Sequence, residues 1–179
     1  MGRDFLLMGL ITSHAGNMSV REGERIWITR RGAMLGHIRD EDLVAVGLNE
    51  VGGEDDLAST ELPTHREIYR VTSAQAILHA HPVNAIALSL YSDEIVPIDV
   101  EGAFVLGKVP VVGGEYQVGS LDVAKRVAEA LKGHKVVVFQ GHGSFSIGES
   151  LSEALHYMSA LEASARIIML NRLLGRTGV

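Results

Sequence analysis

The segment Ala76-Ile77-Leu78-His79-Ala80-His81-Pro82 limits the possible folds of this chain more than any other. Its apolar run is typical of a buried strand, and Pro82 ends the strand because proline has no backbone N–H to donate. On a strand, residues two apart share a face, so His79 and His81 point the same way. On a helix they would lie on nearly opposite sides, and one metal ion could not bind both. The segment alone leaves two interpretations open: a metal site, or two buried histidines with local hydrogen bonds.

The composition of the chain excludes several classes of protein. Its 179 residues are enough for a substantial core, and we expect residues 1–179 to form a single domain. No apolar stretch approaches the roughly 20 residues of a membrane span, and no secretory signal is recognisable. The absence of cysteine excludes disulfides and thiolate zinc sites, and makes a cytoplasmic location the expectation.

The charge of the chain also limits its partners. The net charge is −6, and lysine and arginine do not cluster, which argues against nucleic acid as the main partner. An anionic substrate would therefore need a local binding site, because the overall field of the chain would not attract it.

Hydrophobic periodicity predicts an α/β fold in which several strands are covered by helices. Helices are predicted over residues 3–13, 60–72, 82–90, 121–131 and 151–174. Strands are predicted over residues 25–29, 43–47, 76–81, 108–112, 135–139 and 144–147. Residues 14–20 and 49–59 are expected to be loops, and residues 93–112 extended segments and loops that end in the strand at 108–112. Ser59 or Thr60 is the expected N-cap of the helix over 60–72.

The segment Gly141-His142-Gly143 offers a third imidazole. Glycine on both sides lets the backbone turn sharply and leaves open space around the histidine, whereas a structural histidine more often lies inside an element. His79, His81 and His142 together could form a facial triad for Zn²⁺ or a similar divalent ion, with one position left open.

The other histidines lack a comparable context. Three lie in predicted loops or at the ends of elements and are expected to be solvated: His14, His37 and His134. His65 and His156 lie on predicted helices, where we expect packing and local hydrogen bonds. His65 follows Glu61 by one helical turn and could support the site from behind.

Glu61 is the carboxylate that the sequence singles out, because it follows Ser59-Thr60 at the start of a predicted helix. The N-terminus of a helix binds anions such as phosphate through its unpaired backbone N–H groups. An ordinary capping sequence is the alternative interpretation of these three residues. The segments Gly16-Asn17 and Arg31-Gly32 are each, taken alone, typical turns.

Taken in order, these motifs resemble the class II aldolase/adducin family. The pattern comprises G-N-x-S at 16–19, I-T-x-x-G at 28–32, S-[ST]-E at 59–61, H-x-H at 79–81 and H-G at 142–143. The order and spacing of five motifs are far more specific than any one of them. The predicted terminal helix, which includes Glu162 and Ala163, is also similar to that of the family.

The resemblance implies a three-layer α-β-α fold with a central, mostly antiparallel sheet, and a homotetramer with sites at subunit interfaces. It implies Zn²⁺ on His79, His81 and His142, and Glu61 as the general acid/base that can also bind the metal when substrate is absent. The implied reaction is cleavage of a ketose 1-phosphate, similar to L-fuculose 1-phosphate, through a metal-stabilised enediolate. Its products would be dihydroxyacetone phosphate and a hydroxyaldehyde. The implied phosphate site comprises Gly16, Asn17, Arg31, Gly32, Ser59 and Thr60.

The sequence departs from the family pattern in three places. Arg30-Arg31 replaces the usual proline and small hydroxyl residue, so a guanidinium could hold part of the phosphate. Pro97 to Glu101 contains no tyrosine where the bacterial fuculose-phosphate aldolases have one, which leaves Asp99 or Glu101 as candidates for a second acid. The sequence ends at Val179 without the tyrosine-bearing tail of longer members. These differences predict an aldolase with relaxed aldehyde specificity.

Other activities in the family remain alternatives. Sugar-phosphate 4-epimerases tend to have aspartate where Glu61 stands, which favours an aldolase, whereas methylthioribulose-1-phosphate dehydratases also use a glutamate. An adducin-like structural module is disfavoured because such modules lack the metal histidines. A cupin-type metal site would require an almost all-β pattern, which the predicted helices contradict.

Overall fold

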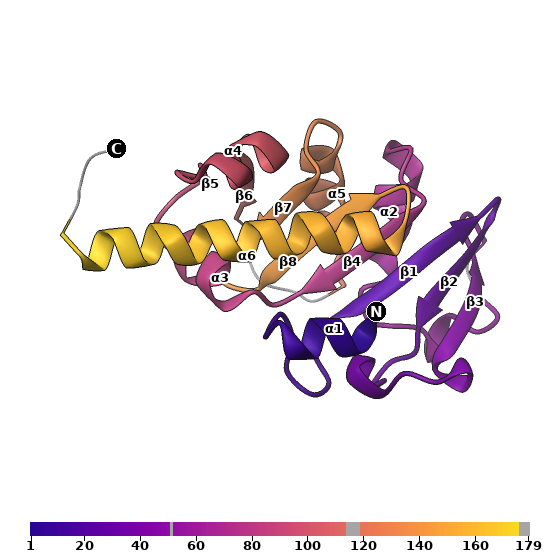
Figure 1. Cartoon of the computed structure of the whole chain (residues 1–179). Coiled ribbons are helices and arrows are strands. Elements are labelled where there is room, and N and C mark those ends of the chain that lie inside the picture. The colour runs from indigo at the N-terminus through magenta and orange to yellow at the C-terminus, as the bar shows by residue number, and fades with distance from the viewer. Residues whose placement is uncertain (51, 114–118, 176–179) are drawn as a thin grey trace.

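A computed structural model describes residues 1–50, 52–113 and 119–175 of the chain. One eight-stranded sheet, in the order β3-β2-β1-β4-β8-β7-β6-β5, forms the middle layer. Figure 1 shows the long helix α6 crossing one face of this sheet, with α3 and α4 beside it. Among the described residues, no helix is long and apolar enough to span a membrane.

The elements have the following bounds. The strands are β1 Asn17–Glu22, β2 Arg25–Thr29, β3 Leu43–Gly47, β4 Ala76–Ala80, β5 Glu94–Ile95, β6 Val109–Val112, β7 Val136–Phe139 and β8 Gly143–Gly148. The helices are α1 Gly2–Leu7, α2 Leu62–Val71, α3 Val83–Ser89, α4 Val100–Leu106, α5 Leu121–Leu131 and α6 Leu151–Leu173. Short 3-10 turns cover Leu35–His37, Asp40–Asp42 and Asp55–Leu57.

The sheet is mostly antiparallel, as the resemblance implies. Among the described strands, every pairing is antiparallel except that of β6 with β7. Alternation along the central strands distributes their side chains to two cores. Ile77 of β4 packs in the cluster that includes α2 and α5. Its neighbour Leu78 packs in the cluster that includes α1 and α6. The predicted three-layer α-β-α fold is therefore confirmed.

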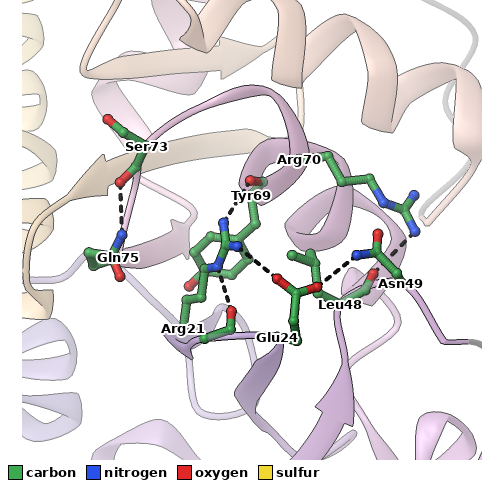
Figure 2. A network of polar contacts seen from close by, with 9 residues as sticks. Arg21, Glu24, Leu48, Asn49, Tyr69, Arg70, Ser73 and Gln75 are labelled. Atoms are coloured by element: carbon green, nitrogen blue, oxygen red, sulfur yellow. Dashed lines mark hydrogen bonds and ion pairs between the residues drawn. The ribbon is translucent and has the colours of Figure 1, made fainter.

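The C-terminal half of α2 is tied to β1 and to the segment after β3 by a network of polar contacts (Figure 2). Arg21 of β1 donates from Nη1 to the backbone carbonyl of Tyr69 at 3.2 Å. The same guanidinium lies 3.4 Å from Glu24, which also accepts from Asn49 at 2.8 Å. Arg70 donates to the carbonyl of Leu48 at 3.1 Å. These contacts fix α2 relative to β1, and the N-cap of α2 and the first residue of β1 contribute to the cavity described below.

Several sequence-based expectations were wrong in detail. Residues 14–20 are not wholly a loop, because β1 begins at Asn17 and pairs with both β2 and β4. Residues 93–112 contain the helix α4, whose first turn is capped by Asp99 accepting from the N–H of Gly102 at 2.7 Å. The helix predicted over 3–13 ends at Leu7. The N-cap of α2 is Glu61 rather than Ser59 or Thr60.

Candidate metal centre

A cavity of about 270 Å³ lies where the N-terminal end of α2 meets one end of β4. Segments that are distant in the sequence contribute to it. The lining residues are His14, Ala15, Gly16, Asn17, Arg30, Arg31, Gly32, Ala33, Ser59, Thr60, Glu61, His79, His81 and His142. The cavity therefore contains every residue to which the family resemblance assigned a metal-binding, acid/base or phosphate-binding role.

Three imidazoles form a compact cluster on one side of the cavity. The ring centroids of His79, His81 and His142 are 4.9, 4.9 and 4.8 Å apart in pairs. One nitrogen from each ring lies within 4.8 Å of the others. The Nε2 atoms of His79 and His81 are 3.0 Å apart. Two nitrogens bound tetrahedrally to one zinc ion lie about 3.3 Å apart, so these donors fit a divalent cation after a small adjustment.

The orientation of His79 is set by its surroundings. Its Nδ1–H donates to the carbonyl of Ser144 on β8 at 3.1 Å, which leaves the lone pair of Nε2 directed at the cluster. A backbone hydrogen bond of this kind typically fixes the tautomer of a metal-binding histidine. Phe145 stacks on the same ring, with centroids 4.2 Å apart. His79 is thus held in a conformation in which Nε2 can bind a metal ion.

Gly143 makes room for the imidazole cluster. A Cβ atom at this position would lie 2.6 Å from the carbonyl oxygen of Ala80, 2.8 Å from Cδ2 of His81 and 2.9 Å from Cε1 of His79. Real Cβ atoms do not approach other atoms so closely. The Gly143 that follows His142 therefore serves the packing of two other histidines.

Burial keeps His79 and His81 neutral. Removal from water disfavours the imidazolium form and holds the pKa of His79 well below its usual value. The same cause, assisted by repulsion from His142, lowers the pKa of His81 to about 4. Only the neutral imidazole has a lone pair for a metal ion. At neutral pH these two rings are consequently ready to bind a cation.

Glu61 lies across from His142 and is almost fully buried. Its Oε1 is 3.6 Å from Nε2 of His142, and its Oε2 accepts from the hydroxyl of Thr64 at 2.8 Å. Burial alone would raise the pKa of this carboxyl. The nearby imidazoles of His142 and His79 and the hydroxyl of Thr64 outweigh burial and lower the pKa to about 2. The carboxylate is therefore ionised at neutral pH and can accept a proton.

Backbone pairing brings two halves of the expected anion site together. The N–H of Arg31 donates to the carbonyl of Leu57 at 2.9 Å, and the N–H of Ser59 donates to the carbonyl of Thr29 at 3.0 Å. The loop after β2 and the segment before α2 are thus locked side by side. The hydroxyl of Ser59 also accepts from the N–H of Glu61 at 3.3 Å.

Gly16 completes the cavity on the side of β1. Its φ of +80° is a left-handed conformation that favours glycine. A Cβ atom there would also lie 2.8 Å from the carbonyl oxygen of His79. The next residue, Asn17, is directly opposite His79 in the β1–β4 ladder, so the strand pairing places its side chain beside the cluster.

Two of the candidates from the sequence do not line the cavity, and other residues do. Asp99 and Glu101 are not among the residues that line the cavity, and the carboxylate of Asp99 caps α4 instead. His14, which we expected to be solvated, lines the cavity while remaining exposed, as does Arg30. The position of His14 beside Gly16 in the same loop was the available signal for its place in the cavity.

Comparison with known proteins gives consistent matches. The family model described as "Class II Aldolase and Adducin N-terminal domain" matches residues 1–169. The chain is 31% identical over 166 residues to an "L-fuculose phosphate aldolase" of Methanocaldococcus jannaschii, covering 91% of this chain and 88% of that protein. It is similar to the crystal structure of an L-fuculose-1-phosphate aldolase from Thermus thermophilus, with a TM-score of 0.93 and 39% identity. That match covers 99% of this chain and 93% of the other.

A relative with a different named activity is almost as similar. The chain is 29% identical over 173 residues to the "3-oxo-tetronate 4-phosphate decarboxylase" of Escherichia coli, covering 93% of this chain and 81% of that protein. Proteins of this kind therefore catalyse more than one reaction, and similarity alone does not choose among them.

Replacing Gly143 with alanine tests whether its missing side chain protects the imidazole cluster. The added Cβ should displace His79 or His81 and weaken zinc binding by about 10–100-fold, the range found when groups that orient metal ligands are altered. The zinc dissociation constant is measured by competition with a chromophoric chelator. Gly133→Ala is the control, because nothing lies within 4 Å of a Cβ added there. Equal zinc affinity in the two variants would show that the cluster does not depend on Gly143.

The depressed histidine pKa values predict how stability depends on pH in chelator-treated protein. Burial lowers the pKa of His65 to about 4, as it does for His81. An unfolded histidine titrates near 6.5, so between about pH 6.5 and 4 the unfolded chain binds more protons. Stability should be fully present above this window and decrease as the pH falls through it. Fully buried His65 alone contributes up to about 1.4 kcal/mol per pH unit.

Urea denaturation at several pH values measures this dependence. His65→Gln should reduce the slope of this dependence, because it removes the buried imidazole. A free energy of unfolding that is constant between about pH 7 and 5 would contradict the expectation.

Proposed function

The chain belongs to the class II aldolase and adducin family and is an enzyme of the aldolase type, and on this premise we propose that it is a zinc-dependent ketose-1-phosphate aldolase. Its proposed substrate is similar to L-fuculose 1-phosphate, and its products are dihydroxyacetone phosphate and a hydroxyaldehyde. The observation that carries the proposal is that one cavity holds three imidazoles, an ionised carboxylate and a loop with an exposed guanidinium.

His79, His81 and His142 would hold the cation, and Glu61 could bind it in the absence of substrate. Three neutral nitrogen donors without thiolate suit Zn²⁺, although another divalent transition metal would also fit this set. When bound, the cation supplies a Lewis acid that polarises a substrate carbonyl and stabilises negative charge on its oxygen. Among the described residues, His14 also lines the cavity but lies outside the cluster of three imidazoles.

The opposite side of the cavity would bind the phosphate. Gly16, Asn17, Gly32, Ser59 and Thr60 offer small side chains, hydroxyls, an amide and backbone N–H groups. The exposed guanidinium of Arg31 would supply charge-assisted hydrogen bonds to phosphate oxygens. An overall charge of −6 makes such a local site necessary for an anionic substrate.

Glu61 would move the proton at the carbon beside the carbonyl. Its carboxylate is ionised at neutral pH, and Thr64 holds one of its oxygens while the other faces His142. In the cleavage direction, the carboxylate would take the proton released by the hydroxyl that becomes the aldehyde, and would return it to the carbon that has lost the aldehyde fragment. In the synthesis direction, it would remove that proton.

We also propose that residues 1–179 form one domain and that the chain assembles as a homotetramer in the cytoplasm. The continuity of one sheet from β3 to β5 supports a single domain. Large apolar side chains stand nearly fully exposed, namely Tyr91 at 84%, Val100 at 88% and Phe104 at 89%. Isolated subunits seldom expose so many large apolar groups together, so their exposure supports assembly.

A coupled assay for dihydroxyacetone phosphate tests the proposed reaction. Purified protein with Zn²⁺ should release dihydroxyacetone phosphate from L-fuculose 1-phosphate and from related ketose 1-phosphates. Epimerisation at C4, dehydration of methylthioribulose 1-phosphate and decarboxylation of 3-oxo-tetronate 4-phosphate are followed in parallel. Predominant turnover in any of these three assays, without aldol cleavage, would assign the chain to that reaction instead.

Glu61→Gln tests the proton-transfer role within the same assay. Because the amide keeps the size of the carboxylate but accepts no proton, kcat should fall by about 10²–10⁴-fold. The zinc content should remain near that of the unsubstituted protein, since the three imidazoles are intact. Glu129→Gln, an exposed change on α5, is the matched control and should retain activity. A Glu61→Gln variant with undiminished kcat would remove Glu61 from the mechanism.

A further inference from the structure

Four buried polar side chains form a chain of hydrogen bonds behind the cavity. Oδ1 of Asn17 lies 2.6 Å from Nε2 of His65, and Nδ1 of His65 lies 2.7 Å from Oγ of Ser19. Oγ of Ser19 lies 2.8 Å from the hydroxyl oxygen of Tyr69. All four residues are at most 6% exposed. Of the four, only Asn17 lines the cavity, so the proposed reaction gives no direct reason for the other three.

The backbone of β1 and α2 holds these four hydrogen-bonded side chains in place. Asn17 and Ser19 are two residues apart on β1 and share a face. His65 and Tyr69 are four residues apart on α2 and face β1 from one side of the helix. The bond from Arg21 of β1 to the carbonyl of Tyr69 fixes the two elements to each other (Figure 2). The four polar groups therefore meet in one fixed order.

The direction of these hydrogen bonds follows from the one at Tyr69, which lies farthest from the cavity. A buried phenol must donate its O–H, and among the described residues Ser19 Oγ is the only hydrogen-bond partner of the Tyr69 hydroxyl. Ser19 then uses its single O–H to donate to Nδ1 of His65. A histidine this deeply buried is neutral, and burial lowers its pKa to about 4. A neutral imidazole that accepts at Nδ1 must donate from Nε2, so Asn17 Oδ1 accepts.

We infer that Ser19 and His65 are positioning residues that hold the Asn17 carboxamide with its NH₂ group toward the cavity. This inference rests on the proposed phosphate site, because an NH₂ group can donate to an anion. The reverse chain would direct Oδ1 into the cavity, and a carbonyl oxygen repels a phosphate. The direction of these buried hydrogen bonds thus decides whether Asn17 attracts or repels the substrate.

The free-energy cost of reversing these hydrogen bonds explains why one direction prevails. In the reverse chain, His65 would donate to Ser19 and Ser19 to Tyr69, which leaves the phenol O–H without an acceptor among the described residues. An unsatisfied buried donor is unfavourable enough to make the reverse state rare. In Tyr69→Phe the reverse state would leave the Ser19 O–H without an acceptor among the described residues, so the direction should persist. In Ser19→Ala, Nδ1 of His65 loses its partner in either direction, so both directions become available and only about half of the molecules should present the NH₂ group.

The tautomer of His65 is the direct readout. Nitrogen NMR of zinc-loaded protein labelled with ¹⁵N-histidine distinguishes the protonated ring nitrogen from the bare one, and His65→Gln identifies the resonances. At neutral pH, we expect Nε2–H alone in the unsubstituted protein and in Tyr157→Phe. Tyr157→Phe is the matched control, because its hydroxyl donates to Glu153 on α6. Ser19→Ala should show both tautomers, whereas Tyr69→Phe should keep Nε2–H alone, because Ser19 must still donate its O–H to Nδ1 of His65. An Nδ1–H tautomer in the unsubstituted protein would overturn the inference.

Binding of inorganic phosphate, measured by calorimetry on the same proteins, separates the positioning role from the proposed phosphate site. Ser19→Ala should weaken phosphate binding about twofold, since half of the molecules are competent, with no change in Tyr157→Phe. Equal affinities in these two variants would overturn the positioning role. Asn17→Asp should weaken binding more than about tenfold, because an acceptor-only group then faces the anion. Unchanged affinity in Asn17→Asp would instead refute the phosphate site, while the tautomer result would still decide the direction of the chain.

Discussion

The pairing of β4 with β1 and β8 at the centre of the sheet determines where the groups of the cavity lie. In this register Asn17 is opposite His79, and His79 is opposite Phe145. A slip of one residue would move His79 to the other face, where α6 packs. The apolar side chains that alternate along β4 and fill both cores resist such a slip. The strength of the two hydrophobic cores therefore secures the geometry of a polar site.

The same burial has an electrostatic consequence. The imidazoles of His79 and His81 are neutral because water is excluded from them, and Glu61 remains ionised only because His142, His79 and Thr64 surround it. The cavity thus concentrates lone pairs and one negative charge in a small volume. A divalent cation would stabilise this arrangement, since it binds neutral imidazoles and offsets the negative charge of the carboxylate. The burial of these side chains therefore sets both their pKa values and their affinity for a metal ion.

The sequence predicted those features of the site that depend on residues close together in the chain. The spacing of His79 and His81 and the glycines around His142 are local, and the structure brings these residues together. β1 was missed because Gly16-Asn17 has the composition of a turn, although Asn17 already pairs with β4. The helix α4 was missed because it is short and rich in valine and phenylalanine, which favour strands. The bonds of His65 to Asn17 and Ser19 join two elements and leave no trace in local patterns.

Titration of chelator-treated protein with Zn²⁺ tests the central claim most directly, with zinc content and release of dihydroxyacetone phosphate measured on the same samples. The account predicts that activity is absent without metal and rises in proportion to bound zinc, up to one ion per chain. His79→Ala should neither retain the ion nor gain activity, whereas His156→Ala should do both. Full aldol cleavage by metal-free protein, or by His79→Ala, would contradict the assignment of the three imidazoles to a catalytic metal.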